Sequence, residues 1–439
     1  MARAALTALV AALALTACSG GVSREEAQAE LDAAAWTYLD LVLEIGEREP
    51  GYVDAYYGPP ERAQKAADAP RTVEELIAAA AALSARLEAV PEARLDEAWR
   101  QRRAYLLAHV GAASARLRMI GGQILPFADE AEALFGVRPQ VQPLETYDPL
   151  LARIGELVPG DGPLAARVDA FKARYVIPPE RLQAVMDAAI AECRARTVAH
   201  FDLPEQERFT LEFVTDQPWS GYNWYRGGAD SLIQINTDLP IYIDRAVDLG
   251  CHEGYPGHHV YNMLLERTFV DERRWVEMSV YPLFSPMSFV AEGTANYGID
   301  LAFPGEQRVR FEREVLYPLA GLDPAGAAAY DELRALSRGL QGAESTIAAA
   351  YLDGQIDRET AIGQLQTYQL SSRARAEQRL AFIEKYRSYI INYGLGRDIA
   401  QAWVESHGDT AEAHWAAMGR LLSSQILPAD LTGSAETGE

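Results

Sequence analysis

The stretch DLGCHEGYPGHHVYNMLL, residues 248–265, decides how the rest of the chain is interpreted. It holds three of the chain's seven histidines, His252, His258 and His259. It begins like the zinc-site signature H-E-x-x-H, in which two histidines four positions apart lie on one face of a helix. Pro256 stands in the place of the second histidine. The stretch is therefore either a metal site with altered spacing or a helix that happens to be rich in histidine.

An unbroken helix cannot bring these histidines together. His258 would point about 240° round the helix from His252, and His259 would lie about 10.5 Å further along the axis. Pro256 cannot donate a hydrogen bond to the carbonyl four residues back, and Gly257 opens backbone conformations that are closed to other residues. We therefore expect a break between the helix that carries His252 and a second helix that starts near His258.

A carboxylate for the same site is expected from Glu292, in the helical stretch SFVAEGTANYGIDLA. It lies 34 positions after His258 (292 − 258). Two histidines and a glutamate from a later helix form a known catalytic zinc arrangement, with water in the fourth position. We predict one Zn²⁺ per chain bound by His252, His258 and Glu292, with His259 as the alternative second ligand.

Glu253 follows the first predicted ligand and is expected to act as general base toward a water molecule that the metal activates. The tetrahedral intermediate also needs a hydrogen-bond donor at its oxyanion. The candidates are the phenols of YRSYIINYGLGRDIAQAW (Tyr386, Tyr389 and Tyr393) and the spare imidazole of His259.

Composition excludes some partners. The chain has 439 residues, of which 49% are hydrophobic and 23% charged, enough for one large or two medium apolar cores. Its net charge of −23 argues against nucleic acid, because little basic surface is left to replace phosphate counterions. No basic run of the kind that binds anionic lipid is present.

The first residues, MARAALTALVAALALTACSGG, are typical of a secretory signal, because the apolar run after Arg3 is too short to span a membrane. Its end, residues 15–18, resembles a bacterial lipoprotein box, which implies a lipidated Cys18. Ser19, with no aspartate there, favours the outer membrane. We expect a periplasm-facing lipoprotein that touches the membrane only through this anchor; a plain cleaved signal peptide is the alternative.

Two further cysteines, Cys193 and Cys251, are able to pair in an oxidising compartment. Cys251 adjoins His252 in an apolar context. Two buried thiols are therefore the favoured expectation.

Helical periodicity dominates the chain. TVEELIAAAAALSARL, for example, opens with a capping box formed by Thr72 and Glu75. Strand patterns are confined to RFTLEFVT (208–215) and SLIQINT (231–237), and WSGYNWYRGGAD between them is interpreted as a turn. The sequence predicts a mainly α, two-lobed fold with a small antiparallel sheet next to the metal-site helix.

Five regions are expected along the chain. They are a signal peptide (1–17), a lipidated tether (18–24), an N-terminal helical lobe (25–205), a catalytic zinc region (206–425) and a disordered tail (426–439).

HEGYPGHH and AEGTANYGIDL together resemble a bacterial family catalogued as domain of unknown function 885. The family pattern, H-E-x-x-P-G-H-H followed by E-G-x-A-x-Y, fits at 252–259 and 292–297. The family is grouped with glutamate-zincin metallopeptidases, whose helical members include relatives of angiotensin-converting enzyme. GYVDAYYGPPE and PFADEAEALFGVRP also resemble family segments, so the resemblance covers most of the chain. It implies a metallopeptidase-like helical fold and favours His258 over His259 as ligand.

The resemblance also implies roles around the substrate. A Tyr-x-x-Gly-Arg segment of the family is matched at 393–397, which implies Tyr393 as oxyanion donor and Arg397 as a clamp for a peptide carboxylate. In related metallopeptidases an exposed edge strand pairs with the extended substrate, and SLIQINT is expected to do so here. From the residues alone, Asn236 is expected either to contact substrate amides or to serve in a cap or turn, and Arg226 of the glycine-rich segment is a candidate contact for a substrate terminus.

The residues predict zinc-dependent hydrolysis, and the resemblance implies that the substrates are short peptides. One alternative is a zinc amidase acting on cell-wall or modified amino-acid substrates. Another is a helical lipoprotein that binds peptides without cleaving them. Glu253 and a site with only three protein ligands disfavour the last, because structural zinc sites usually have four.

Overall fold

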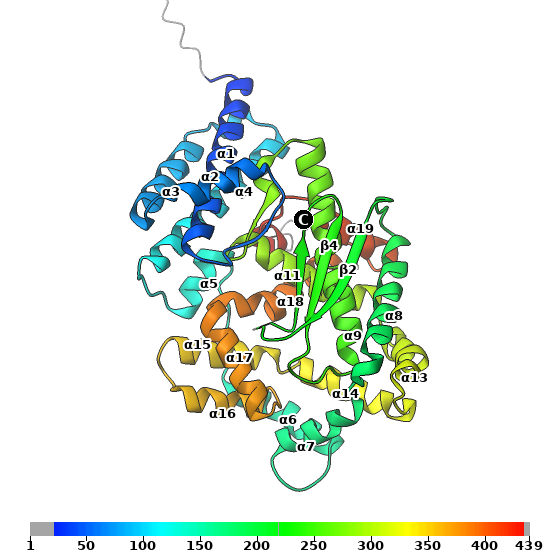
Figure 1. Ribbon diagram of the computed structural model, residues 1–439. Coiled ribbons are helices and arrows are strands. Elements are labelled where there is room, and N and C mark those ends of the chain that lie inside the picture. Colours follow the sequence, from blue (N-terminus) through cyan, green and yellow to red (C-terminus); the bar gives the residue numbers. More distant parts are fainter. Residues whose placement is uncertain (1–21, 218, 434–439) are drawn as a thin grey trace, which may run out of the picture.

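The computed structural model describes residues 22–217 and 219–433 (Figure 1). The predicted signal peptide and Cys18 lie outside these ranges. Within them, no helix combines the length and the apolar character needed to cross a membrane.

The fold is mainly α, as predicted. The helices of the first half are α1 (Arg24–Arg48), α2 (Pro60–Asp68), α3 (Val73–Glu88), α4 (Glu97–Ile120), α5 (Phe127–Phe135), α6 (Asp148–Leu157), α7 (Leu164–Lys172) and α8 (Pro179–Val198). Short helical turns join them: η1 (Glu92–Arg94), η2 (Leu144–Tyr147) and η3 (Ala173–Tyr175). The predicted capping box at the start of α3 is confirmed, because the Thr72 hydroxyl accepts from the Glu75 N–H while the Glu75 carboxylate accepts from the Thr72 N–H.

The second half begins with α9 (Asp244–Leu249), the π-helical turn η4 (Gly250–Gly254) and α10 (His258–Leu265). There follow η5 (Glu266–Glu272), η6 (Val276–Ser279), α11 (Pro286–Ala302), α12 (Gln307–Phe311), η7 (Glu312–Leu316), α13 (Tyr317–Ala320) and η8 (Pro324–Gly326). The remaining helices are α14 (Ala327–Arg338), α15 (Gln341–Leu352), α16 (Arg358–Tyr368), α17 (Arg373–Tyr386), η9 (Arg387–Ile390), α18 (Ile391–Glu405), α19 (Ala411–Leu422) and α20 (Pro428–Thr432). Thus α20 forms within the tail predicted to be disordered.

The sheet before the histidine cluster is mixed rather than antiparallel. It contains β2 (Arg208–Val214), β3 (Gly221–Tyr225) and β4 (Asp230–Asn236) in the order β2-β4-β3. Since β3 runs back before β4 begins, β4 is parallel to β2 and antiparallel to β3. The segment interpreted as a turn therefore supplies an edge strand, and SLIQINT is the central strand. A second, two-stranded sheet pairs β1 (Val53–Tyr56) with β5 (Val280–Pro282).

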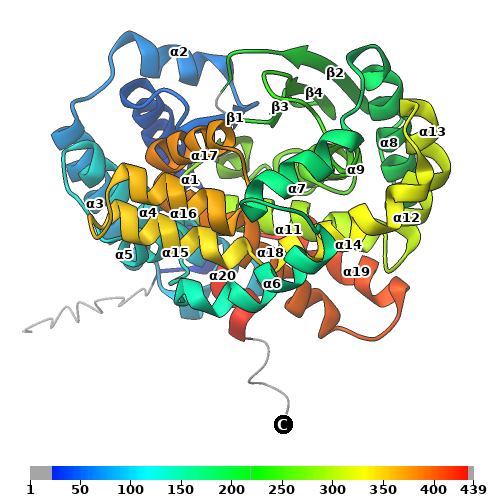
Figure 2. The ribbon, with the colours of Figure 1, turned by 90° about the horizontal axis from the view of Figure 1, so that it is seen from below.

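Two large apolar cores lie on either side of α11. One gathers α1, α3, α4 and α5 with α15, α16 and α17; the other gathers α8, α9, α10 and α19 with β4. Figures 1 and 2 show these two groups of helices with α11 and α18 between them. Helix α11 belongs to both cores, because Phe289 is buried in the first and Val290 in the second. Each lobe therefore draws on chain segments from both sides of residue 205, and the metal-site segment lies where the lobes meet.

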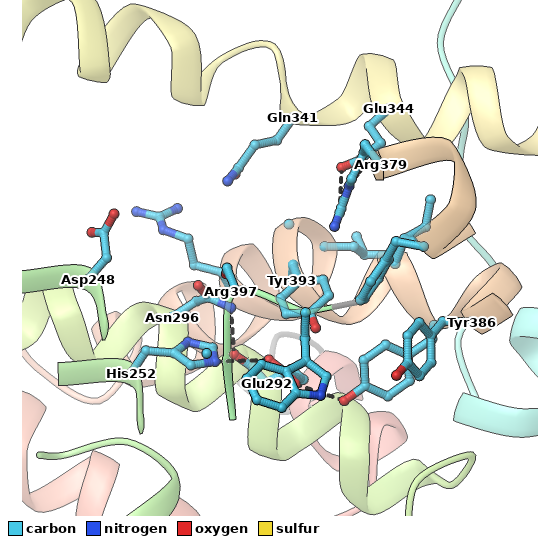
Figure 3. A pocket seen from close by; sticks show the side chains of 18 of the residues that line it. Asp248, His252, Glu292, Asn296, Gln341, Glu344, Arg379, Tyr386, Tyr393 and Arg397 are labelled. Carbon is cyan, nitrogen blue, oxygen red and sulfur yellow. Dashed lines mark hydrogen bonds and ion pairs between the residues drawn. The ribbon is translucent and has the colours of Figure 1, made fainter. Parts of the chain in front are cut away.

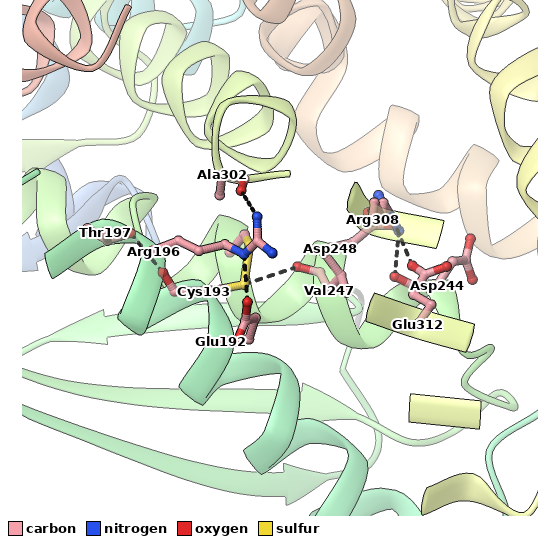
Figure 4. Close-up of a disulfide and its surroundings, with 11 residues drawn as sticks. Glu192, Cys193, Arg196, Thr197, Asp244, Val247, Asp248, Ala302, Arg308 and Glu312 are labelled. Carbon is pink, nitrogen blue, oxygen red and sulfur yellow. Dashed lines mark hydrogen bonds and ion pairs between the residues drawn. A yellow bond between two sulfur atoms is a disulfide. The ribbon is translucent and has the colours of Figure 1, made fainter. Parts of the chain in front are cut away.

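A disulfide joins Cys193 of α8 to Cys251 of η4 (Figure 4). The expectation of two buried thiols is therefore wrong. The sequence could not show that α8 packs directly on η4, where a Cβ added to Gly250 would lie 3.3 Å from the backbone nitrogen of Ile190. The bond ties the segment that carries His252 to a long helix of the same lobe.

Candidate metal centre

The backbone breaks where the Pro-Gly pair predicted. Helix α9 runs into η4, the chain turns extended at Tyr255, and α10 begins at His258. The Tyr255–Pro256 peptide bond is cis. The Gly257 N–H donates to the Cys251 carbonyl at 3.0 Å, so the chain folds back on the preceding turn.

This fold-back brings two histidines together that a straight helix would separate. Nε2 of His252 and Nε2 of His258 lie 3.2 Å apart. Gly257 permits the approach, because a Cβ on it would lie 1.8 Å from the carbonyl oxygen of His252. Only a residue without a side chain fits between the two turns.

Glu292 of α11 completes the cluster. Its Oε2 lies 3.3 Å from Nε2 of His252, and its Oε1 lies 3.7 Å from Nε2 of His258. One ligand atom from each of the three residues falls within 4.8 Å of the others. Helix α11 is held in place by α18, against which it packs so closely that a Cβ on Gly293 would lie 2.5 Å from the Gly396 carbonyl oxygen.

These side chains fit a divalent metal ion. Ligand atoms about 2.0–2.1 Å from a tetrahedral ion lie about 3.3 Å from one another. The separations of 3.2 Å between the imidazoles and 3.3 Å between His252 and Glu292 agree with that value. Oε2 of Glu292 is buried and, among the described residues, makes no hydrogen bond of acceptable geometry. The cluster therefore has the donor set and the spacing to hold a divalent metal ion.

Electrostatics also favours a cation at this point. Burial alone would raise the pKa of Glu292, but the imidazoles of His258 and His252 hold it well below its usual range. Burial likewise would lower the pKa of His258, but the Glu292 carboxylate outweighs it and raises that pKa to about 9. The site therefore favours positive charge, which a bound metal ion would supply in place of the proton on His258.

Glu253 lies beside the three ligands. Its side chain is buried, and its carboxylate is near enough to His258 to raise the pKa of that imidazole further. Strand β3 packs against it: a Cβ on Gly221 would lie 3.0 Å from Oε1 of Glu253, and the Asn223 amide donates to the Glu253 carbonyl at 2.7 Å. The edge strand therefore fixes the position of Glu253.

Two tyrosines border the cluster from α18 and the turn before it. Tyr389 donates to Oε1 of Glu292 at 2.7 Å, whereas the sequence predicts it only as one of three candidate oxyanion donors. Tyr393 lines the same cavity, with its ring centroid 6.5 Å from that of His252. Burial and the charge of Glu292 raise the pKa of Tyr393 well above its usual range, so its hydroxyl keeps its proton and remains a hydrogen-bond donor.

Asp54 of β1 also faces this region, and sequence reasoning missed it. The Tyr222 hydroxyl of β3 donates to it. Burial raises the pKa of Asp54 to about 6, against the opposing effects of the Tyr222 hydrogen bond and His258. The pairing of β1 with β5 brings Asp54 here from a point about two hundred residues before His258, a proximity that no local pattern signals.

The structure places His259 away from the metal ligands. Its Nδ1 lies 2.8 Å from the Ser231 hydroxyl and its Nε2 lies 3.3 Å from Oε1 of Glu207. It is fully buried and does not line the cavity. His259 is therefore neither the second ligand nor an oxyanion donor; it joins α10 to the sheet.

The structure does not place Asn236, Arg226 and Arg397 as free side chains facing a substrate. Asn236 donates to the carbonyls of Gln217 and Trp219 and so holds a loop, as a residue of the central strand rather than of an edge. Arg226 is exposed and does not line the cavity. Arg397 does line it, but its guanidinium is bound by Asp300 and Asp398. Asn223 of β3, next to Glu253, does line the cavity.

A cavity of about 1290 Å³ contains the whole cluster. It is lined by His252, Glu253, His258 and Glu292, by β3, and by residues of α14, α15, α17 and α18. In Figure 3, His252 and Glu292 lie between Asp248 on one side and Tyr386 on the other, with Gln341, Glu344 and Arg379 facing them across the space. Since the cavity lies between the two lobes, it can receive an extended molecule.

Comparisons with known proteins leave the family open. No family model matches the chain, and no curated protein matches it, so the resemblance to domain of unknown function 885 stays a prediction. A protein of Colwellia psychrerythraea described as a lipoprotein is 16% identical, with a TM-score of 0.47, over 80% of this chain and 67% of that one. The M32 carboxypeptidase from Deinococcus radiodurans R1 is 13% identical, with a TM-score of 0.49, over 93% of this chain and 94% of that one. At these identities and scores, neither structure determines what this chain binds or cleaves.

Proposed function

We propose that the chain is a zinc-dependent hydrolase that cleaves the amide bonds of short peptides. The observation that carries this proposal is the cluster of His252, His258 and Glu292, with ligand atoms within 4.8 Å of one another on the wall of a large cavity. Two imidazoles and one carboxylate are the donor set of catalytic zinc sites, which keep one position free. A cation held there supplies a Lewis acid that activates water and polarises a carbonyl group.

Glu253 is the proposed general base. It follows His252 directly, is buried in the same cavity wall, and is held by β3. A carboxylate in this place takes a proton from the attacking water and later gives it to the leaving amine. The Asn223 amide donates to the backbone carbonyl of Glu253 and not to its carboxylate, so this contact leaves the carboxylate oxygens available to water.

Tyr393 is the proposed donor to the developing oxyanion. Its hydroxyl stays protonated because burial and Glu292 raise its pKa. A phenol that cannot ionise donates without adding negative charge to the site. Tyr389 is less suited, because its hydroxyl is already bound to Glu292.

The edge strand β3 is the proposed contact for the substrate backbone. Asn223 lines the cavity, and its Oδ1 is buried without a hydrogen-bond partner among the described residues. An unpaired buried acceptor costs free energy that a substrate N–H would recover. The position of Asn223 next to Glu253 suits the amide group of a residue adjoining the bond to be cut.

The test compares the wild type with Glu253→Gln. Both proteins are analysed for zinc and incubated with a mixture of peptides of two to ten residues, and the products are identified by mass spectrometry. The variant should keep one zinc per chain and lose about 10²- to 10⁴-fold in rate, the usual contribution of general base catalysis. His258→Ala, as a comparison, should lose both zinc and activity.

Two results would contradict parts of this proposal. Full activity in Glu253→Gln would remove Glu253 from the reaction. One zinc per chain with no cleavage of any peptide by the wild type would reject a peptidase and favour an amidase acting on cell-wall or modified amino-acid substrates. For location, the N-terminal sequence supports the proposal of a periplasm-facing lipoprotein anchored at Cys18, and labelling with radioactive palmitate tests it.

A further inference from the structure

Three cationic side chains gather at one end of the cavity, away from the zinc ligands. Lys172, Arg245 and Arg375 line both the main cavity and a smaller one of about 200 Å³ that adjoins it. Lys172 Nζ and the Arg375 guanidinium carbon lie 4.6 Å and 4.9 Å from the ring centre of Tyr242. The chain as a whole has a net charge of −23, so three neighbouring cations at one end of the cavity contrast with the rest of the protein.

Lys172 and Arg375 are not neutralised by the protein. Among the described residues, no carboxylate lies within 4.0 Å of either charge. The acidic groups nearby are engaged elsewhere. Asp244 accepts from the Tyr330 hydroxyl, and Asp248 is bound by Arg308 and Arg245.

The remaining acidic group, Asp169, has its Oδ1 3.5 Å from the Tyr242 hydroxyl. Burial is the main cause that lowers the pKa of Lys172; Arg375 and Arg245 add to it, and Asp244 and Asp248 oppose it. Lys172 therefore holds its charge at a cost in a half-enclosed space, and a bound anion would stabilise it.

The end of the cavity that is lined by Lys172, Arg245 and Arg375, called the recess below, lies away from the three proposed metal ligands along the segment α9–η4. Arg245 precedes His252 by seven residues on the continuous helical segment α9–η4, which separates the two residues by about 10 Å along the axis. An extended peptide covers about 3.3–3.6 Å per residue. A group bound at the recess would therefore lie about three residues from a bond held at the metal ligands.

We infer that Lys172 and Arg375, assisted by Arg245, form a subsite for a carboxylate of the substrate about three residues from the scissile bond. The inference rests on the proposed function for the place where the bond is cut. It restricts the substrate class to peptides that carry a carboxylate at this distance, either a free C-terminus or an acidic side chain. With a free C-terminus, the product released would be a tripeptide and not a single amino acid.

The test measures binding, so that it does not depend on turnover. Zinc-loaded Glu253→Gln is titrated with acetylated Ala/Gly hexapeptides by calorimetry. One peptide has a free C-terminus, one is the C-terminal amide, and a set of amides carries a single glutamate at each position in turn. The free acid and the amide with glutamate at the matching position should bind at least about tenfold more tightly than the neutral amide, as expected for charge-assisted hydrogen bonds.

Variants locate the effect. Lys172→Met with Arg375→Met, which keeps the apolar stems on Tyr242, should abolish the preference for the carboxylate and leave the affinity for the neutral amide unchanged. The control is Lys385→Met. It removes a charge from the same cavity, and Lys385 Nζ lies 5.0 Å from the ring centre of Tyr386. Figure 3 shows Tyr386 on the side of His252 and Glu292 opposite to Asp248. The charge-preserving pair Lys172→Arg with Arg375→Lys should keep the preference.

The outcomes separate this inference from the proposed function. Equal binding of acid and amide, or a preference that survives in the double Met variant, would overturn the subsite. So would an equal loss in Lys385→Met. A carboxylate preference that depends on Lys172 and Arg375, in a protein whose wild type cleaves no peptide, would support the subsite and reject the peptidase. Thermal unfolding of each variant shows whether it is folded.

Discussion

Gly257→Ala is the substitution that most sharply perturbs the break between η4 and α10. The added Cβ would lie 1.8 Å from the carbonyl oxygen of His252 and 2.5 Å from that of Cys251. Real Cβ atoms do not approach other atoms closer than 3.0 Å, so the backbone has to move by at least 1.2 Å (3.0 − 1.8). The atoms that it meets are backbone atoms, and no flexible side chain can move aside.

A movement of this size is large compared with the tolerance of a metal site. Ligand distances in such sites hold within about 0.2 Å. Gly257→Ala should therefore separate His258 from His252 and Glu292 and lower zinc affinity by at least about 100-fold, more than the 10- to 100-fold typical of lost supporting contacts. A chelator-competition titration measures the affinity, and inductively coupled plasma analysis gives the zinc content.

Gly363→Ala is the matched control. Gly363 lies in α16, and a Cβ there would meet nothing within 4 Å. This change should leave zinc affinity unchanged and stabilise the protein by about 0.5–1 kcal/mol, as Gly→Ala does within helices. Wild-type zinc affinity in Gly257→Ala would refute the proposed role of the break.

Three further predictions follow from particular contacts. Burial would lower the pKa of His258, but Glu292 raises it to about 9, so the metal must displace a proton at lower pH. Zinc affinity should therefore rise about tenfold per pH unit between pH 7 and 8.5 in chelator competition; a pH-independent affinity would contradict this. Cys193→Ser removes a cross-link over 58 residues. The loss of this restraint on the unfolded chain should lower the free energy of unfolding by about 4 kcal/mol. Urea unfolding should show a lower midpoint that no longer responds to reductant, whereas an unchanged midpoint would show that the bond adds nothing. Asn223→Ala removes the free acceptor at the cavity and should raise KM about tenfold with a smaller effect on kcat. Unchanged steady-state kinetics would exclude Asn223 from substrate binding.

Periodicity was sufficient for the helices but not for the sheet. The spacing of apolar residues predicts most helices, because each buries one face. Strand order has no such local signal. Glycines flank β3 on both sides, as in a turn, yet its residues pair with β4 and make it an edge strand. The placement of Asn236 at the substrate depended on the wrong edge.

The approach of His252 to His258 could be predicted because it is determined locally. A proline and a glycine between two histidines leave few backbone paths, and one of them brings His252 and His258 together. Partners contributed by tertiary packing could not be found in this way. Asp54 arrives through β1, Tyr389 through the contact of η9 with α11, and Cys193 through the contact of α8 with η4. His259 resembles a ligand in the sequence, and only its position against Ser231 shows that it is not.

The most direct test of the central claim is X-ray absorption spectroscopy at the zinc edge on the purified chain, together with its zinc content. We predict one zinc per chain, coordinated only by nitrogen and oxygen at about 2.0–2.1 Å, with multiple-scattering features from two imidazoles. These features should fall to one imidazole or disappear in His258→Ala. A chain without zinc, a sulfur ligand, or an unchanged spectrum in His258→Ala would contradict a centre built from His252, His258 and Glu292.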